Sequence, residues 1–180
     1  MMRIAFTMAP GRGDTDLLLE RLARTLIGRG ARLAGVVQTN TECANQGLCD
    51  MDVRVLPDGP VIRISQSLGA GARGCRLNPE ALEEAVGHVA AQMEAGADLL
   101  IVNKFGRHEA EGRGFRPLIA EALAREIPVL VGLNRLNAEA FHEFVDGMAL
   151  ELEPKLDALL CWSRDAMGLA PDMDETRARG

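Results

Sequence analysis

The sequence has few aromatic residues and no excess of positive charge. Its 180 residues include one tryptophan, five phenylalanines and no tyrosine, and the formal net charge is −6 with a pI near 5.1. Proteins that bind single-stranded RNA or DNA usually combine a basic surface with stacking aromatic rings. The composition therefore argues against nucleic acid as a partner.

Long apolar runs and a disulfide pattern are also missing. No stretch approaches the roughly 18 apolar residues of a membrane span, and the first residues lead into a strand-like segment rather than a signal peptide. The four cysteines, Cys43, Cys49, Cys75 and Cys161, form no CxxC pair, which favours reduced thiols. We expect a cytoplasmic protein without a membrane span.

The composition that is present, 47% apolar and 26% charged, suits one compact domain over residues 1–170, followed by a mobile tail over 171–180. Strand-like and helix-like segments alternate, which predicts a three-layer α/β fold with a mostly parallel sheet. An antiparallel hairpin over 52–65 should flank this sheet, and 39–47 should form an exposed loop. Strands are expected at 3–7, 34–38, 99–102, 127–133 and 150–152, and helices at 15–28, 79–95, 115–125, 137–145 and 154–167.

Positive charge gathers directly after the apolar strand expected at 99–102. In open α/β sheets, ligands bind beyond the carboxyl ends of the strands. Four basic residues stand there against two acids, so an anionic ligand is the first hypothesis, and a solvated loop without a ligand is the alternative. The residues are Lys104, Arg107, Arg113 and Arg116, with Glu109 and Glu111.

The turn between the first strand and helix has the position of a phosphate-binding loop. Such a loop reads G-x-x-x-x-G-K-[ST], whereas residues 8–15 read M-A-P-G-R-G-D-T. Gly13 and Thr15 match the motif, but Met8 replaces its first glycine and Asp14 replaces its lysine. Because one charge contact contributes on the order of 4 kcal/mol at an effective dielectric constant of about 20, Asp14 should repel a polyphosphate.

Two interpretations of this turn remain open. Arg12 compensates in part for Asp14, and the backbone of Gly11 and Gly13 at the helix N-terminus still offers donors to an anion. Alternatively, Asp14 is simply the N-cap of the helix and the glycines make a tight turn.

Several phrases of the sequence resemble known families. Residues 49–52, 74–79 and 103–116 resemble an uncharacterised bacterial family of unknown function, some of whose members are encoded beside molybdate-uptake genes. Residues 8–15, 98–116 and 127–133 resemble the P-loop nucleoside-triphosphatases. This second resemblance implies a degenerate Walker A motif at 8–15 and a degenerate Walker B motif, with Asn103 and Lys104 at its acidic pair. It also matches Glu109 to an acid retained downstream.

Two main hypotheses follow for function. The first is an accessory or regulatory protein that binds a nucleotide, phosphate or an oxyanion such as molybdate without hydrolysing it. The second is a nucleoside-triphosphatase in which Arg12 or Lys104 replaces the missing lysine and Glu109 is the catalytic acid. A scaffold with a vestigial pocket is a third possibility. The expected ligand-binding residues are Gly11, Arg12, Gly13, Asp14, Thr15, Asn103, Lys104, Arg107 and Arg113.

Other groups have weaker support. Magnesium is not expected, because the motif acids are absent. A soft metal at Cys49 and Cys75 has a spacing that matches no recognised zinc pattern. His108 is the histidine best placed for acid-base chemistry. A protein partner or a homo-oligomer is compatible with the sequence.

Overall fold

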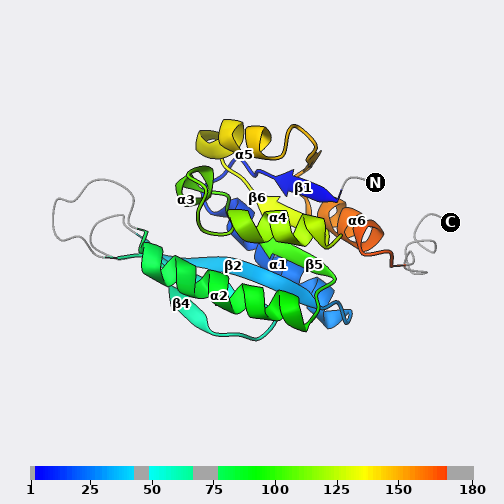
Figure 1. The fold of residues 1–180 in the computed structure, drawn as a ribbon, viewed down its shortest axis with the longest axis horizontal. Helices are drawn as coiled ribbons and strands as arrows, with labels where there is room; N and C mark the ends of the chain where they lie inside the picture. The colour runs from blue at the N-terminus through cyan, green and yellow to red at the C-terminus, as the bar shows by residue number, and fades with distance from the viewer. Residues whose placement is uncertain (1–2, 43–48, 67–76, 170–180) are drawn as a thin grey trace.

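The computed structural model describes residues 3–42, 49–66 and 77–169. In this part of the chain, a central sheet is covered by helices on both faces (Figure 1). The strand order is β4-β3-β2-β5-β6-β1-β7. The strands are β1 (Ile4–Thr7), β2 (Leu33–Glu42), β3 (Cys49–Val55), β4 (Val61–Arg63), β5 (Leu99–Val102), β6 (Val129–Gly132) and β7 (Leu150–Leu152).

The sheet is parallel except at one edge. Strands β2, β5, β6, β1 and β7 pair in parallel, whereas β3 pairs antiparallel with both β2 and β4. Every residue of β1, β5 and β6 is buried, as expected for strands covered on both faces. The predicted three-layer, mostly parallel fold and its flanking hairpin are confirmed.

The helices divide the core into two apolar clusters. Figure 1 shows α2 (Pro79–Ala95) and α4 (Arg116–Ala124) in front of the sheet, where they pack with α5 (Ala138–Phe144) over one face. Helices α1 (Asp14–Gly28) and α6 (Leu156–Ala166) cover the opposite face, where Leu19, Leu22 and Trp162 pack against the strands. Two short elements, α3 (Arg107–Ala110) and the 3₁₀ turn η1 (Arg135–Asn137), follow the ends of β5 and β6.

Local signals set several boundaries correctly. The Asn78 side chain accepts hydrogen bonds from the N–H groups of Glu80 and Ala81, and Pro79 occupies the first helical position of α2. This is the arrangement that an asparagine followed by proline favours, because both residues suit the unpaired N–H groups of a first helical turn.

Three local predictions are wrong. Residues 39–42 do not form an exposed loop, because β2 continues through Glu42 and pairs residue by residue with β3. Asp14 is not the N-cap of α1, because Gly13 takes that position with a left-handed φ of 78° and Asp14 is the first helical residue. The segment after β5 is not all loop, since residues 107–110 form α3.

The remaining predictions for the chain ends and loops cannot be compared with the structure. The tail over 171–180, Cys43 and Cys75 lie outside the described residues. Cys161 is an exposed free thiol. Within the described residues, no helix has both the length and the hydropathy needed to cross a membrane.

Gly35 gives a test of how closely β2 and β5 approach. Its φ is +121°, and a Cβ added there would lie 1.9 Å from the Ile101 carbonyl oxygen. Gly35→Ala should therefore lower the free energy of unfolding by about 3 kcal/mol or more, measured by urea denaturation. Gly87→Ala is the matched control, because a Cβ there meets no atom within 4 Å. That change should stabilise α2 by roughly 0.5–1 kcal/mol; equal effects of the two substitutions would contradict the close approach.

Candidate functional site

A pocket of about 620 Å³ lies at the carboxyl ends of β1, β5 and β6. We call it the loop pocket, and it is the place where ligands bind in open α/β sheets. Three segments that follow these strands form its walls. The lining residues are 8–13, 15 and 16 after β1, 103 and 104 after β5, and 132–135 at the end of β6.

The loop after β1 presents backbone donors at the start of α1. Asp14 donates its N–H to the Gly11 carbonyl oxygen at 3.2 Å, and the Ala9 N–H donates to Thr15 Oγ1 at 3.0 Å. Within the described residues, the N–H groups of Gly11, Arg12 and Gly13 have no recorded partner. Because α1 also contributes a partial positive charge at its N-terminus, this loop can bind an anion.

Three basic side chains line the loop pocket. Arg12, Lys104 and Arg135 are exposed, and none forms an ion pair with any residue that the structure describes. Asp16 is the one carboxylate among the lining residues. Unpaired cations around a concave site raise the local concentration of anions, so the pocket is suited to an anionic ligand although the whole chain is acidic.

Asp14 does not belong to the lining of the loop pocket. The Asp14 carboxylate lies against Gly11, because a Cβ added at Gly11 would be 2.0 Å from Asp14 Oδ2. Asp14 was expected to oppose a phosphate from the position of the P-loop lysine. The carboxylate stays close to one wall of the pocket, because Gly11 is a lining residue, and the neighbouring Arg12 offsets its charge in part.

A polar network around the buried Asp16 and Asn103 supports the floor of the loop pocket. Asn103 Nδ2 donates to Asp16 Oδ1 at 2.6 Å, and Asn103 Oδ1 accepts from the Gln38 N–H at 2.9 Å. Asn40 Nδ2 donates to Asp16 Oδ2 at 2.6 Å, and Asn40 Oδ1 accepts from Gln38 Nε2 at 2.8 Å. Both oxygens of the buried Asp16 carboxylate thus accept hydrogen bonds, which offsets the cost of removing it from water.

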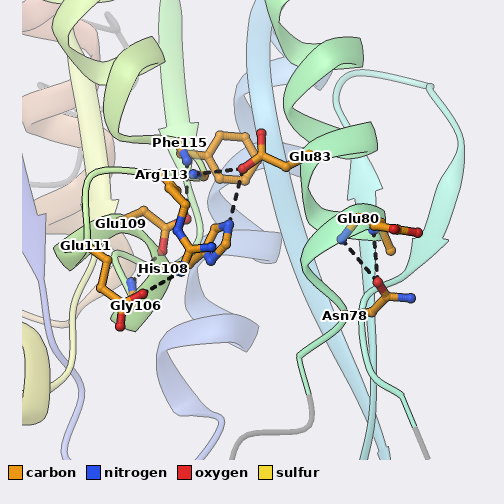
Figure 2. A network of polar contacts seen from close by, with 11 residues as sticks. Asn78, Glu80, Glu83, Gly106, His108, Glu109, Glu111, Arg113 and Phe115 are labelled. Carbon is orange, nitrogen blue, oxygen red and sulfur yellow. Dashed lines mark hydrogen bonds and ion pairs between the residues drawn. The ribbon is translucent and has the colours of Figure 1, made fainter.

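The segment around α3 forms a separate network (Figure 2). Glu109 is buried, and its two carboxylate oxygens accept the N–H groups of Gly106 at 3.0 Å and Phe115 at 3.2 Å. Burial raises the pKa of Glu109 above its ordinary value of 4.5, although these N–H bonds act in the opposite direction. Through these two hydrogen bonds, the Glu109 side chain joins the two ends of the segment from 106 to 115.

The remaining charged groups of this segment pair with one another. Arg107 and Arg113 both contact Glu111, and these pairs lower the pKa of the exposed Glu111 carboxyl. The buried His108 ring lies 3.2 Å from Glu83, which also accepts the Gly114 N–H (Figure 2). The described residues contain no group of three His, Cys, Asp or Glu side chains arranged for a metal ion.

The structure brings only part of the predicted site together. Arg107 and Glu109 line a neighbouring pocket, and Arg113 lies beside the start of α2. Asp16 and Arg135 line the loop pocket but were not predicted. Arg135 could have been found, because it follows an apolar strand just as Lys104 does. The predicted residues that line the loop pocket are Gly11, Arg12, Gly13, Thr15, Asn103 and Lys104.

A mostly parallel sheet with a glycine-containing loop between its first strand and helix occurs in P-loop nucleoside-triphosphatases and also in dinucleotide-binding folds. The solution structure of a human cancer-related nucleoside triphosphatase has this similarity, with a TM-score of 0.60 and 16% identity. The match covers 92% of this chain and 96% of that one.

The chain belongs to the family described as protein of unknown function (DUF2478), which it matches over residues 4–162. It is also 34% identical over 173 residues to the molybdenum import ATP-binding protein ModC 2 of Bradyrhizobium diazoefficiens. That match covers 96% of this chain but 19% of ModC 2, so the chain spans about a fifth of the relative's length.

The contact between Asp16 and Asn103 explains why an amide suits position 103. Asn103→Asp would place a second carboxylate against Asp16 Oδ1 in place of an N–H donor. We expect the free energy of unfolding at neutral pH to fall by about 3 kcal/mol, measured by urea denaturation. The double variant Asp16→Asn/Asn103→Asp exchanges the two groups and restores a donor between them. It should recover at least about 1 kcal/mol, and strictly additive losses would contradict the contact.

The raised pKa of Glu109 predicts a pH dependence of stability. The native state holds the Glu109 proton more tightly than the unfolded chain does. Its contribution to stability is therefore fully present below the ordinary pKa of 4.5 and is lost as pH rises through the raised pKa. The difference in unfolding free energy between the wild type and Glu109→Gln should therefore fall as the pH rises above 4.5.

Glu111→Gln is the control for this titration. The pKa of Glu111 is lowered, so its contribution is present above its ordinary pKa and is lost as pH falls. The corresponding difference for this exposed residue should be small and of opposite sign. Parallel pH profiles for the two variants would contradict the assignment of the titration to Glu109.

Proposed function

We propose that this protein binds a nucleotide or a smaller phosphate-like oxyanion in the loop pocket, as an accessory or regulatory protein that does not hydrolyse it. The observation that carries the proposal is the set of three basic side chains, Arg12, Lys104 and Arg135, around N–H groups at the start of α1 that have no partner among the described residues. Each charge contact with an anion contributes from about 1 kcal/mol in water to about 4 kcal/mol at an effective dielectric constant near 20.

The residues of the hydrolytic motifs argue against turnover. Phosphoryl transfer depends on a lysine that contacts the terminal phosphates and on acids that hold magnesium and position the nucleophile. Asp14 stands at the lysine position, and Asn103 and Lys104 stand at the acidic pair. Asp16 is the nearby carboxylate, but both of its oxygens already accept amide hydrogen bonds.

The similarity to ModC 2 supports a link with molybdenum uptake. A segment like this chain occurs within an ATP-binding protein whose name gives molybdenum import as its role. Fusion of two modules keeps them at high local concentration, which favours pairs that work together. We propose that this chain acts together with such an importer component, with a nucleotide or the molybdate oxyanion as the bound species.

An active nucleoside-triphosphatase is the second candidate. Arg12 and Lys104 both line the loop pocket, so either side chain can supply the positive charge of the missing lysine from a different place in the sequence. Glu109 would then have to act as the catalytic acid. Sustained turnover of ATP or GTP with Mg²⁺, abolished by Glu109→Gln in a folded variant, would favour this candidate over the binding protein.

Calorimetry tests the anion site directly. Titration with ATP, GTP, orthophosphate, molybdate, tungstate and sulfate should give saturable heat with at least one of them. Arg12→Gln should weaken that binding roughly tenfold, because it removes an unpaired cation from the pocket wall. Because Arg12 is exposed, Arg12→Gln should not impair folding, and thermal unfolding of the variant checks this.

Arg113→Ala is the matched control. Arg113 is also an exposed arginine, but it pairs with Glu111 and lines a different part of the surface. Binding should be unchanged in this variant. The proposal is wrong if none of the six anions gives heat, or if Arg113→Ala weakens binding as much as Arg12→Gln does.

A further inference from the structure

A second pocket of about 410 Å³ lies beside the loop pocket, between the middle of β2, the carboxyl end of β5 and the start of α2. We call it the apolar pocket. Its volume lies within the usual range of roughly 300–1,000 Å³ for small-molecule sites. Its apolar lining includes Val36, Val53, Ile64, Leu82, Phe115 and Leu136.

Most of this lining is part of the core. Val36, Val53, Ile64, Leu82 and Phe115 are all buried, and they belong to the cluster between the sheet and α2. The apolar pocket is therefore set into rigid, packed elements rather than lying on a mobile surface. A site of this kind is largely formed before a ligand arrives, which reduces the ordering that binding requires.

Leu136 marks the mouth of the apolar pocket. It is 92% exposed, so this large apolar side chain has almost no cover from the protein. Its neighbour Arg135 lines the loop pocket, and the turn η1 thus directs one side chain to each pocket. An exposed leucine at the entrance of an apolar cavity would gain burial if a ligand entered.

The charges at the apolar pocket favour one sign of ligand. Lys104, which has no ion pair with any described residue, belongs to the wall shared by both pockets, whereas Arg107, which also lines the apolar pocket, is paired with Glu111. Glu109 is the one carboxylate of the lining, and its two oxygens already accept backbone N–H groups. An anionic group on a ligand is therefore best placed beside Lys104, with its apolar part toward Val53 and Leu82.

We infer that the apolar pocket is a second ligand site, which takes a small organic anion with an apolar body and a carboxylate or phosphate group beside Lys104. This site goes beyond the anion binding proposed for the loop pocket, because inorganic phosphate or molybdate has no apolar part to place there. Since both pockets share Lys104, an anion in one lowers the affinity of the other for an anion.

Fluorescence titration with 2-naphthoate tests the inference, with 2-naphthamide as the uncharged analogue. The wild type should bind one 2-naphthoate per chain and should bind 2-naphthamide more weakly. Leu136→Gln should weaken 2-naphthoate binding about tenfold, because it removes the apolar lip of the pocket. Lys104→Gln should remove the preference for 2-naphthoate over 2-naphthamide. A carboxylate and a phosphate are compared by repeating the titration with 2-naphthyl phosphate.

Leu17→Gln is the matched control for the leucine change. Leu17 is also a large exposed apolar residue, at 66%, but it lines neither pocket. Binding should be unchanged in this variant. The inference is wrong if 2-naphthoate does not bind, if it binds with no fixed stoichiometry, or if both leucine variants weaken it equally. Because the calorimetric test of the loop pocket uses inorganic anions and Arg12→Gln, failure of one site is distinguishable from failure of the other.

Discussion

The hydrogen bond between Asn103 Nδ2 and Asp16 Oδ1, 2.6 Å long, joins the start of α1 to the end of β5. Gln38 and Asn40 extend this contact to β2, so one buried network ties the loop after β1 to two neighbouring strands. A buried carboxylate is tolerated only where its oxygens accept hydrogen bonds. Loss of one donor from this network would therefore lower the free energy of unfolding. It fixes where the loop and Lys104 stand relative to each other, and both pockets depend on that placement.

The position of the pockets follows from the topology of the sheet. Loops after parallel strands gather at one edge, so residues distant in sequence, such as Arg12, Lys104 and Arg135, line the same cavity. The antiparallel addition of β3 extends the sheet on the far side of β2, and Val36 and Val53 then supply one wall of the apolar pocket. The edge hairpin thus has a function in the architecture that the parallel core alone would not provide.

The sequence predicts the fold better than it predicts the site. Continuous apolar runs specify β5 and β6, and Asn78 followed by proline specifies the start of α2, because these signals are local. The extension of β2 through Glu42 depends on pairing with β3, which no local pattern reveals. Likewise, basic residues close in sequence were grouped into one site, whereas α3 and the contacts with Glu111 keep Arg107 and Arg113 outside the loop pocket.

The direction of a side chain matters as much as its charge at the P-loop position. Counted along the sequence, Asp14 reverses the sign of the motif lysine, and in the structure its carboxylate lies against Gly11, a lining residue of the loop pocket. Arg12, Lys104 and Arg135 outnumber this one charge, but the sequence has no lysine at the start of α1 and no acid at positions 103 and 104 to hold magnesium or position a nucleophile. Binding needs only the retained positive charge and the backbone donors, whereas phosphoryl transfer needs groups that strengthen their contacts in the transition state. This difference is the physical reason for proposing recognition without hydrolysis at the loop pocket.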